Sequence, residues 1–216
     1  MKKILFLVAA LLVGASAFAQ NEYNLRRRSL FNVLPVTSKD IIFLGNSITD
    51  GCEWAELFDN RHIKNRGISG DRSVWLLDRI DSIIAGHPKK LFLMIGTNDL
   101  IAGTAPRDVV ANIGKLIDRF QTESPWTKLF VQSLLPMNGL DPGYENRPNR
   151  DKGAEIIETN VLLEKLCLEK TVVYLDIYSS LVDARGQLDK HFTSDGLHLT
   201  GDGYLVWKEI LKPYVK

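Results

Sequence analysis

Two places far apart in the sequence carry side chains that together could perform nucleophilic chemistry. Ser47 follows the apolar stretch Ile41–Leu44 in DIIFLGNSITDG. Asp195 and His198 stand three residues apart in TSDGLHLTGDGY, near the C-terminus. A serine hydroxyl becomes a nucleophile when a histidine takes its proton, and a carboxylate fixes the tautomer of that histidine and stabilises its charged form. Ser47 and Asp195 alone are also typical of a turn or a helix N-cap, and His198 of a polar residue with satisfied hydrogen bonds, so the elements that position them must decide.

Short apolar segments alternate with segments of helical periodicity along the chain. The strand candidates are Ile41–Leu44, His62–Asn65, Leu91–Ile95, Leu129–Leu134 and Thr171–Leu175. Apolar residues recur at helical spacing over 74–84, 109–120, 156–166 and 204–211. This alternation predicts an α/β fold, a three-layer α/β/α sandwich around a five-stranded parallel sheet. We expect the flavodoxin-like strand order 2-1-3-4-5, which binds ligands beyond the carboxyl ends of the first and third strands.

Three polar turns meet at that position of the predicted fold. Ser47 follows the first strand, NRGISGDRS over residues 65–73 follows the second, and GTND over residues 96–99 follows the third. Because the carboxyl ends of parallel strands lie at one edge of the sheet, we expect these turns to converge. Their convergence favours a catalytic role for Ser47.

Four short motifs, in this order, resemble the SGNH superfamily of GDSL-type esterases and lipases. GNSIT resembles the nucleophile motif, usually Gly-Asp-Ser, ISGDRS the glycine motif, GTND the Gly-x-Asn-Asp motif, and DGLH is the Asp-x-x-His motif. The nearest branch is that of the platelet-activating-factor acetylhydrolase-like enzymes and carbohydrate O-acetylesterases. The matched positions are Ser47, Gly70, Asn98, Asp195 and His198.

The resemblance implies a serine esterase. The backbone N–H groups of Ser47 and Gly70 and the side-chain amide of Asn98 would form the oxyanion hole, where negative charge develops during acyl transfer. His198 would deprotonate Ser47, protonate the leaving alcohol and then activate water. Asp195 would orient His198.

The nucleophile motif departs from the family at one position, because Asn46 stands where aspartate is usual. That residue is not part of the triad, so the assignment of Ser47 is unaffected. The ordinary α/β-hydrolase fold fits less well, because its elbow is G-x-S-x-G and this serine lies in GNSIT.

We expect hydrolysis of short-chain acyl esters, above all acetyl esters on carbohydrates. Candidate substrate-binding residues are Trp54, Trp75 and the loop Pro136–Asp151, with Arg147 and Arg150 suited to an acidic sugar. A lysophospholipase or lipase, and a non-catalytic glycan-binding module on the same fold, are the alternatives. A flavin-binding protein is a weaker alternative that rests on sheet topology alone.

The first 19 residues predict that the protein is exported from the cytoplasm. Lys2 and Lys3 precede an apolar run, and small residues end at Ala19, which is typical of a cleaved signal peptide over 1–19. Residues 20–39 are predicted to form a solvated N-terminal arm that includes Arg26-Arg27-Arg28, and 40–216 the hydrolase domain. A periplasmic or secreted protein without a stable membrane anchor is expected, and the oligomeric state stays open.

Composition and charge limit the classes of protein and of partner that remain open. The chain has 216 residues, 45% hydrophobic and 25% charged, as a globular domain requires. Without residues 1–19, which carry two lysines and no acidic residue, the formal net charge changes from +1 to −1, so nothing favours nucleic acid as a partner. Two cysteines, Cys52 and Cys167, make no metal site of cysteine pairs, and neither a metal nor a cofactor is expected.

Overall fold

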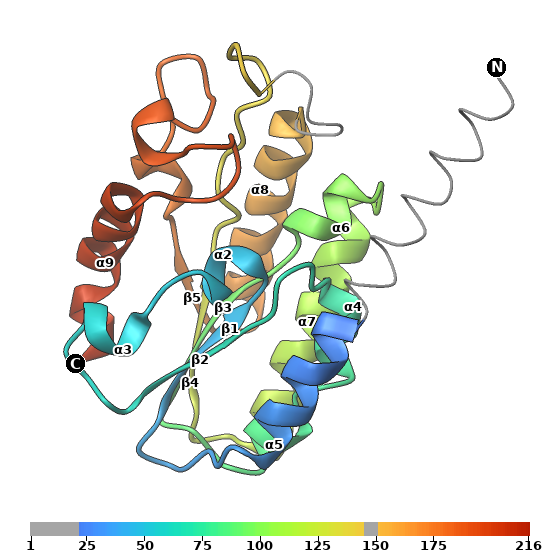
Figure 1. Ribbon diagram of the computed structural model, residues 1–216. Helices are drawn as coiled ribbons and strands as arrows, with labels where there is room; N and C mark the ends of the chain where they lie inside the picture. The colour runs from blue at the N-terminus through green and yellow to red at the C-terminus, as the bar shows by residue number, and fades with distance from the viewer. Residues whose placement is uncertain (1–21, 145–150) are drawn as a thin grey trace, which may run out of the picture.

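The computed structural model describes residues 22–144 and 151–216. Its centre is a parallel sheet in the order β2-β1-β3-β4-β5, which confirms the predicted topology (Figure 1). The strands are β1 Ile41–Gly45, β2 Ile63–Gly67, β3 Lys90–Met94, β4 Lys128–Gln132 and β5 Val173–Leu175. The central strands β1 and β3 are buried along their whole length, as continuous apolar runs predict.

Helices cover both faces of the sheet and complete the three layers. The helices are α2 Ser47–Asp50, α3 Trp54–Leu57, α4 Ser73–Leu77, α5 Asp81–Ile84, α6 Thr97–Ile101, α7 Pro106–Glu123, α8 Gly153–Glu169 and α9 Gly201–Val215. Short 3₁₀ turns cover Tyr178–Ser180 and Lys190–Phe192. Helices α3 and α9 lie on one face, and α4, α5, α7 and α8 lie on the other (Figure 1).

The predicted helical stripe over 74–84 is divided in the structure. It forms the two short helices α4 and α5, and Val74 is 47% exposed rather than part of the core. Between them, Arg79 turns inward and donates to Asp71 and to the carbonyl groups of Gly45 and Arg66. A buried guanidinium with three acceptors needs an irregular backbone around it, which the apolar spacing does not reveal.

The prediction of a solvated arm is wrong for residues 22–33, which form a helix packed against the domain (blue in Figure 1). Phe31 is buried, and the guanidinium groups of Arg27 and Arg66 lie over its ring, 4.5 and 4.9 Å from the ring centre. Arg28 donates to the carbonyl of Asp78 at 2.9 Å. The arginines therefore bind the helix to the domain through cation–π contacts and hydrogen bonds.

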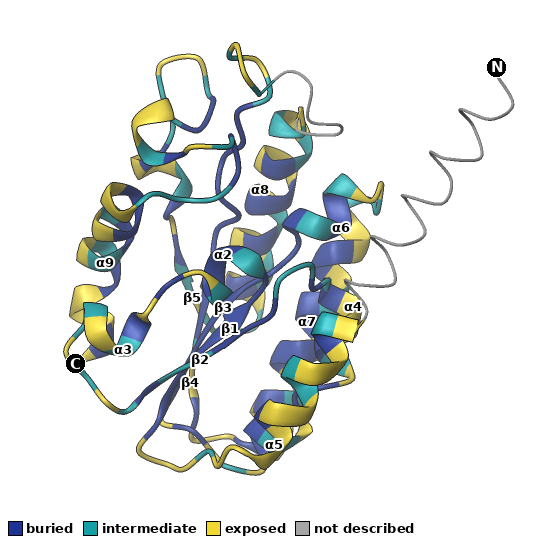
Figure 2. Cartoon of the chain, viewed as in Figure 1, coloured by how far each residue is buried: buried dark blue, intermediate teal, exposed yellow. Residues whose placement is uncertain are grey.

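An aromatic cluster fills the space between the sheet and the α3–α9 layer. The Trp54 ring stacks on Phe43 at 4.4 Å and meets Trp207 edge-on at 4.8 Å. Figure 2 shows the strands as a buried centre, with exposed residues on the outward sides of the helices.

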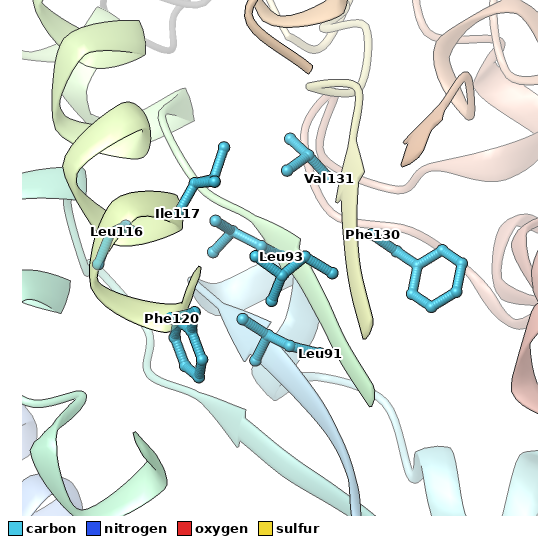
Figure 3. A pocket seen from close by; sticks show the side chains of 8 residues that line it. Leu91, Leu93, Leu116, Ile117, Phe120, Phe130 and Val131 are labelled. Carbon is cyan, nitrogen blue, oxygen red and sulfur yellow. The ribbon is translucent and has the colours of Figure 1, made fainter. Parts of the chain in front are cut away.

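Packing on the opposite face leaves one small void beneath α7 (Figure 3). It measures about 10 Å³ and has an entirely apolar lining. A void of this size is at the lower limit for one water molecule and offers it no hydrogen-bond partner. It is a packing defect and not a ligand site. The lining residues are Leu91, Leu93, Leu116, Ile117, Phe120, Leu129, Phe130 and Val131.

Candidate active site

Ser47 lies in a sharp turn between β1 and α2. Asn46 is the N-cap of α2, and its side-chain oxygen accepts the backbone N–H of Ile48 at 3.0 Å. Asparagine and aspartate cap helices about equally well, so the departure from the family motif preserves the turn. Gly45 permits the turn, because a Cβ there would lie 2.2 Å from Thr49 Oγ1 and 2.5 Å from the Met94 carbonyl oxygen.

The structure brings Ser47, His198 and Asp195 together in one chain of hydrogen bonds. Nε2 of His198 is 2.9 Å from Oγ of Ser47, and Nδ1 is 2.8 Å from Oδ2 of Asp195. The other carboxylate oxygen, Oδ1, accepts the backbone N–H groups of Leu197 at 2.9 Å and His198 at 2.8 Å. This geometry permits a proton to pass from the serine to the histidine while the carboxylate stays in place.

The carboxylate of this triad is held in its charged form. Burial alone would raise the pKa of Asp195, but the hydrogen bonds from His198 and Leu197 outweigh it and lower the pKa to about 2. A carboxylate that accepts several N–H groups is stabilised as the anion. Asp195 is therefore an acceptor throughout the neutral range, as the orientation of a histidine requires.

A backbone hydrogen bond to Asn138 fixes the turn that carries Asp195 and His198. Gly196 adopts the left-handed conformation at φ 79°. The Gly196 carbonyl accepts the backbone N–H of Asn138 at 2.8 Å. The Gly196 N–H donates to Oγ1 of Thr193 at 2.9 Å. Helix α9 follows directly, and its Tyr204 hydroxyl donates to the carbonyl of Ile48 at 2.8 Å. Helix α9, which follows the turn, is thus joined to α2, the helix that begins at Ser47.

Gly70 and Asn98 follow β2 and β3 at the same edge of the sheet. Gly70 adopts a left-handed conformation, φ 80°, which glycine tolerates without strain. Asn98 lies in the first turn of α6, and its amide donates to the main-chain carbonyl of Asp71 at 2.9 Å. An amide nitrogen carries two N–H groups, and this bond uses one of them.

Asp99, next to Asn98, supports the loops. Its carboxylate accepts the backbone N–H of Ser73 at 2.9 Å and its hydroxyl at 2.7 Å. Asn112 in turn donates to that hydroxyl at 3.0 Å. These bonds join the start of α4 to α6 and α7, the structural role that its place beside Asn98 indicates.

Comparison with known proteins shows the family of this chain. Residues 43–206 match the GDSL-like Lipase/Acylhydrolase family. The platelet-activating factor acetylhydrolase IB subunit alpha2 of Rattus norvegicus is 32% identical over 181 residues, which are 81% of this chain and 73% of the relative. The chain belongs to this family. It is a carboxylic ester hydrolase.

Solved structures extend the likeness of this GDSL-like acylhydrolase to the whole fold. A structure from Streptococcus pneumonia, named after platelet activating factor, superposes with a TM-score of 0.88 at 28% identity and covers 96% of this chain and 99% of its own. An acetyl-xylooligosaccharide esterase from Geobacillus shares the fold with a TM-score of 0.65 at 16% identity, over 82% of this chain and 94% of that one.

Two of the four predicted substrate-binding residues can be placed in this acylhydrolase. Trp54 is wrong as a pocket residue, because it is 1% exposed and packs in the aromatic core, with its ring N–H bound to the carbonyl of Thr49. Trp75 is 36% exposed on α4, next to the Gly70 loop, and the Arg72 guanidinium lies over its ring at 5.2 Å. Arg147 and Arg150 lie outside the described residues.

Sequence reasoning missed the residues that hold the segments after β1 and β2 in this acylhydrolase. Asp50 and Asp71 accept hydrogen bonds from Tyr23, Asn24 and Arg27 of the helix over 22–33. The spacing of Asn24, Arg27 and Phe31 places them on one face of a helix, and this signal was available in the sequence.

Within 22–144 and 151–216, no three His, Cys, Asp or Glu side chains form a group that could hold a metal ion. Cys52 and Cys167 are both buried free thiols, and burial raises the pKa of each to about 12. No helix in these two ranges is long and apolar enough to cross a membrane.

Proposed function

We propose that this acylhydrolase cleaves short-chain acyl esters, acetyl esters first, through an acyl-enzyme on Ser47. The hydrogen-bonded chain Asp195–His198–Ser47, with contacts of 2.8 and 2.9 Å, is the observation that carries the proposal. It places a nucleophile, a base and an orienting carboxylate within direct reach of one another, as serine ester hydrolysis requires.

Acylation begins when Oγ of Ser47 attacks the ester carbonyl carbon and Nε2 of His198 takes the hydroxyl proton. The carbonyl oxygen becomes an oxyanion, which the backbone N–H groups of Ser47 and Gly70 and the remaining amide N–H of Asn98 stabilise. The intermediate collapses when its bond to the alcohol oxygen breaks, and His198 gives its proton to that leaving oxygen. Ser47 is left as an acyl ester.

Deacylation repeats these steps with water. His198 takes a proton from the water, the resulting hydroxide oxygen attacks the acyl carbon, and a second oxyanion forms at the same donors. Its collapse breaks the bond to Oγ, and His198 returns the proton to Ser47. The products are the carboxylic acid and the free enzyme. Asp195 stays ionised and holds the imidazole throughout.

The substrate class rests on the relatives and on the sequence. The mammalian relatives bear the name acetylhydrolase, which supports an acetyl group on the acyl side. The predicted signal peptide over 1–19 supports export, and we infer that the alcohol is an extracytoplasmic carbohydrate. The exposed Trp75, next to the Gly70 loop, is suited to pack against a sugar ring or the acyl chain.

Comparison of the wild type with Ser47→Ala on 4-nitrophenyl acetate and 4-nitrophenyl octanoate tests the proposal. We expect the wild type to prefer acetate and the variant to lose at least about 10⁴-fold in kcat. A mass increase of one acetyl group on the Ser47 peptide after rapid acid quench would identify the intermediate. Preference for octanoate would replace the acetylesterase with a lipase, and full activity in Ser47→Ala would refute the nucleophile.

Activity on the synthetic esters does not identify the alcohol. Acetate release from acetylated xylan or chitin oligosaccharides, measured beside release from an acetylated phospholipid, separates the carbohydrate from the lipid. Preferred release from the phospholipid would contradict the carbohydrate part of the proposal and leave the acyl-enzyme mechanism standing.

A further inference from the structure

The oxyanion loop, residues 69–71, has one backbone hydrogen bond of its own, from the N–H of Asp71 to the carbonyl of Ile68 at 3.1 Å. Gly70 at its centre carries no side chain and adopts the left-handed conformation. Its position therefore depends on the neighbours Ser69 and Asp71. Asp71 also fixes the second predicted donor, because its main-chain carbonyl accepts the Asn98 amide at 2.9 Å. Whatever holds Ser69 and Asp71 thus sets the geometry of the whole oxyanion hole.

Ser69 is held by Asp50, three residues after the nucleophile. Oδ2 of Asp50 accepts the Ser69 hydroxyl at 3.0 Å and its backbone N–H at 3.3 Å. The same oxygen accepts the hydroxyl of Tyr23 at 2.7 Å, and Oδ1 accepts Arg27 at 3.3 Å. The Asp50 side chain is 12% exposed. Its carboxylate thus connects the nucleophile helix, the oxyanion loop and the helix over 22–33.

Asp71 is held in a second, fully buried cluster. Its carboxylate has no exposed surface and accepts Nδ2 of Asn24 at 2.8 Å and Nε of Arg79 at 2.6 Å. Arg79 also donates to the carbonyl groups of Gly45 and Arg66, at the carboxyl ends of β1 and β2. Burial raises the pKa of Asp71, and Arg79 and Asn24 offset part of that rise. A buried carboxylate that loses one such partner is strongly penalised.

Tyr23 and Asn24 are adjacent in the helix over 22–33, and each reaches one of these two carboxylates. Phe31, Arg27 and Arg28 already attach this helix to the domain. Asn24 is nevertheless 6% exposed and points its amide at the oxyanion loop.

We propose that Tyr23 and Asn24 are positioning residues that fix the oxyanion hole through Asp50 and Asp71. The helix over 22–33 then contributes to catalysis by holding Asp50 and Asp71, without direct contact with Ser47, His198 or Asp195. A donor displaced by about 1 Å from its hydrogen-bonding position loses much of its effect on the developing charge, so small movements of the loop reduce the rate. This proposal rests on the function proposed above.

The test is steady-state hydrolysis of 4-nitrophenyl acetate by the full chain and its variants Tyr23→Phe and Asn24→Ala. We expect kcat to fall about 10-fold in each variant while KM changes less than about twofold, because the donors act on the transition state. Asn32→Ala is the matched control. Asn32 lies near the other end of the same helix, where its side-chain oxygen accepts the Ser82 hydroxyl at 3.3 Å. It should retain the kcat of the wild type.

A double-mutant cycle with Asn98→Ala separates positioning from general loosening of the fold. If Asn24 acts through the oxyanion donors, its replacement should cost less than about threefold once Asn98 is already alanine. An equal fractional loss in both backgrounds, or an equal loss in Asn32→Ala, would overturn the proposal.

Two further outcomes are informative. Tyr23→Phe removes a single hydroxyl, so it carries the test alone should Asn24→Ala fail to fold, and an unchanged kcat in it would overturn the proposal. If the wild type and Ser47→Ala hydrolyse the ester equally, the proposed function itself fails, and this inference fails with it. A wild type whose activity depends on Ser47, with Tyr23→Phe and Asn24→Ala at full rate, would sink only the inference.

Discussion

The two halves of the active site are supported in contrasting ways. Ser47, Gly70 and Asn98 each follow a strand of the sheet, and hydrogen bonds to the Asp50 carboxylate and to the main-chain carbonyl of Asp71 join their loops to one another. Asp195 and His198 follow no strand and lie in one irregular turn between β5 and α9, where His198 is 44% exposed at its side chain.

In the proposed mechanism, the difference corresponds to what each half has to do. Stabilisation of an oxyanion depends on donors that are already in place, so its supports have to be rigid. A general base needs only hydrogen-bond reach to one hydroxyl, and a local turn that carries its own orienting carboxylate provides it. Changes to the two halves should therefore differ in size and in kind.

The largest effect should follow from removing the base. His198→Ala leaves Ser47 without a proton acceptor, and we expect kcat on 4-nitrophenyl acetate to fall by about 10⁴-fold or more. Added imidazole should restore part of the rate, because the exposed side chain leaves a space that solvent can reach. A variant that retains more than a tenth of the activity would contradict the assignment of the base.

The next effect concerns the rigid half. Asn98→Ala should lower kcat by about 10²- to 10³-fold, the usual cost of one oxyanion donor, with KM nearly unchanged. Asn112→Ala is a suitable control, since Asn112 reaches the same region only through the Ser73 hydroxyl. A rise in KM at constant kcat would show that Asn98 binds the ground state and does not stabilise the oxyanion.

A smaller effect should appear in the turn. Gly196→Ala combines a left-handed residue with a Cβ only 2.2 Å from the Asn138 carbonyl oxygen. We expect a loss of about 3 kcal/mol in the free energy of unfolding, measured by urea denaturation. Gly186→Ala is the control, because Gly186 is also left-handed (φ 77°) and has nothing within 4 Å of such a Cβ. It should lose about 1 kcal/mol. Equal losses of unfolding free energy in the two variants would show that Asn138 moves aside and the close contact costs nothing.

The smallest effect is a dependence of stability on pH. Hydrogen bonds hold the pKa of Asp195 at about 2, below its ordinary value, so the folded state binds this proton less readily than the unfolded one. The stabilisation is complete above the ordinary pKa and disappears as the pH falls through about 2. Between about pH 5 and pH 3 we expect it to fall by about 1 kcal/mol. In Asp195→Asn, the free energy of unfolding measured by denaturation should decline less steeply between these pH values. Equal slopes of unfolding free energy against pH in the wild type and the variant would contradict this prediction.

The sheet and the hydrogen-bonded chain Asp195–His198–Ser47 could be predicted because their signals are local. Apolar runs such as Ile41–Leu44 need no partner to be recognised as buried strands, and topology then places their carboxyl ends together. Asp195 and His198 are close in sequence, so their pairing could be predicted without coordinates. The motif resemblance supplied Gly70 and Asn98.

The predictions that failed concern residues whose environment depends on distant partners. Trp54 and Trp75 are the same residue type near the same motifs, yet one packs under the sheet and the other lies at the surface. Arg27 and Arg28 belong to a short basic run, and only Phe31, Asp50 and the Asp78 carbonyl show why they are bound. Burial of a polar or aromatic side chain is a tertiary property, which composition and spacing do not determine.

The hydrogen bond between Ser47 and His198 also bears on how the chain folds. It joins residues 151 positions apart, and between them the chain completes four of the five strands. Contacts of such long range form late, because the loop that they close is entropically costly until the intervening sheet has assembled. Recovery of esterase activity during refolding should therefore lag behind the return of the far-ultraviolet signal of the helices, and the active site reports on completion of the fold.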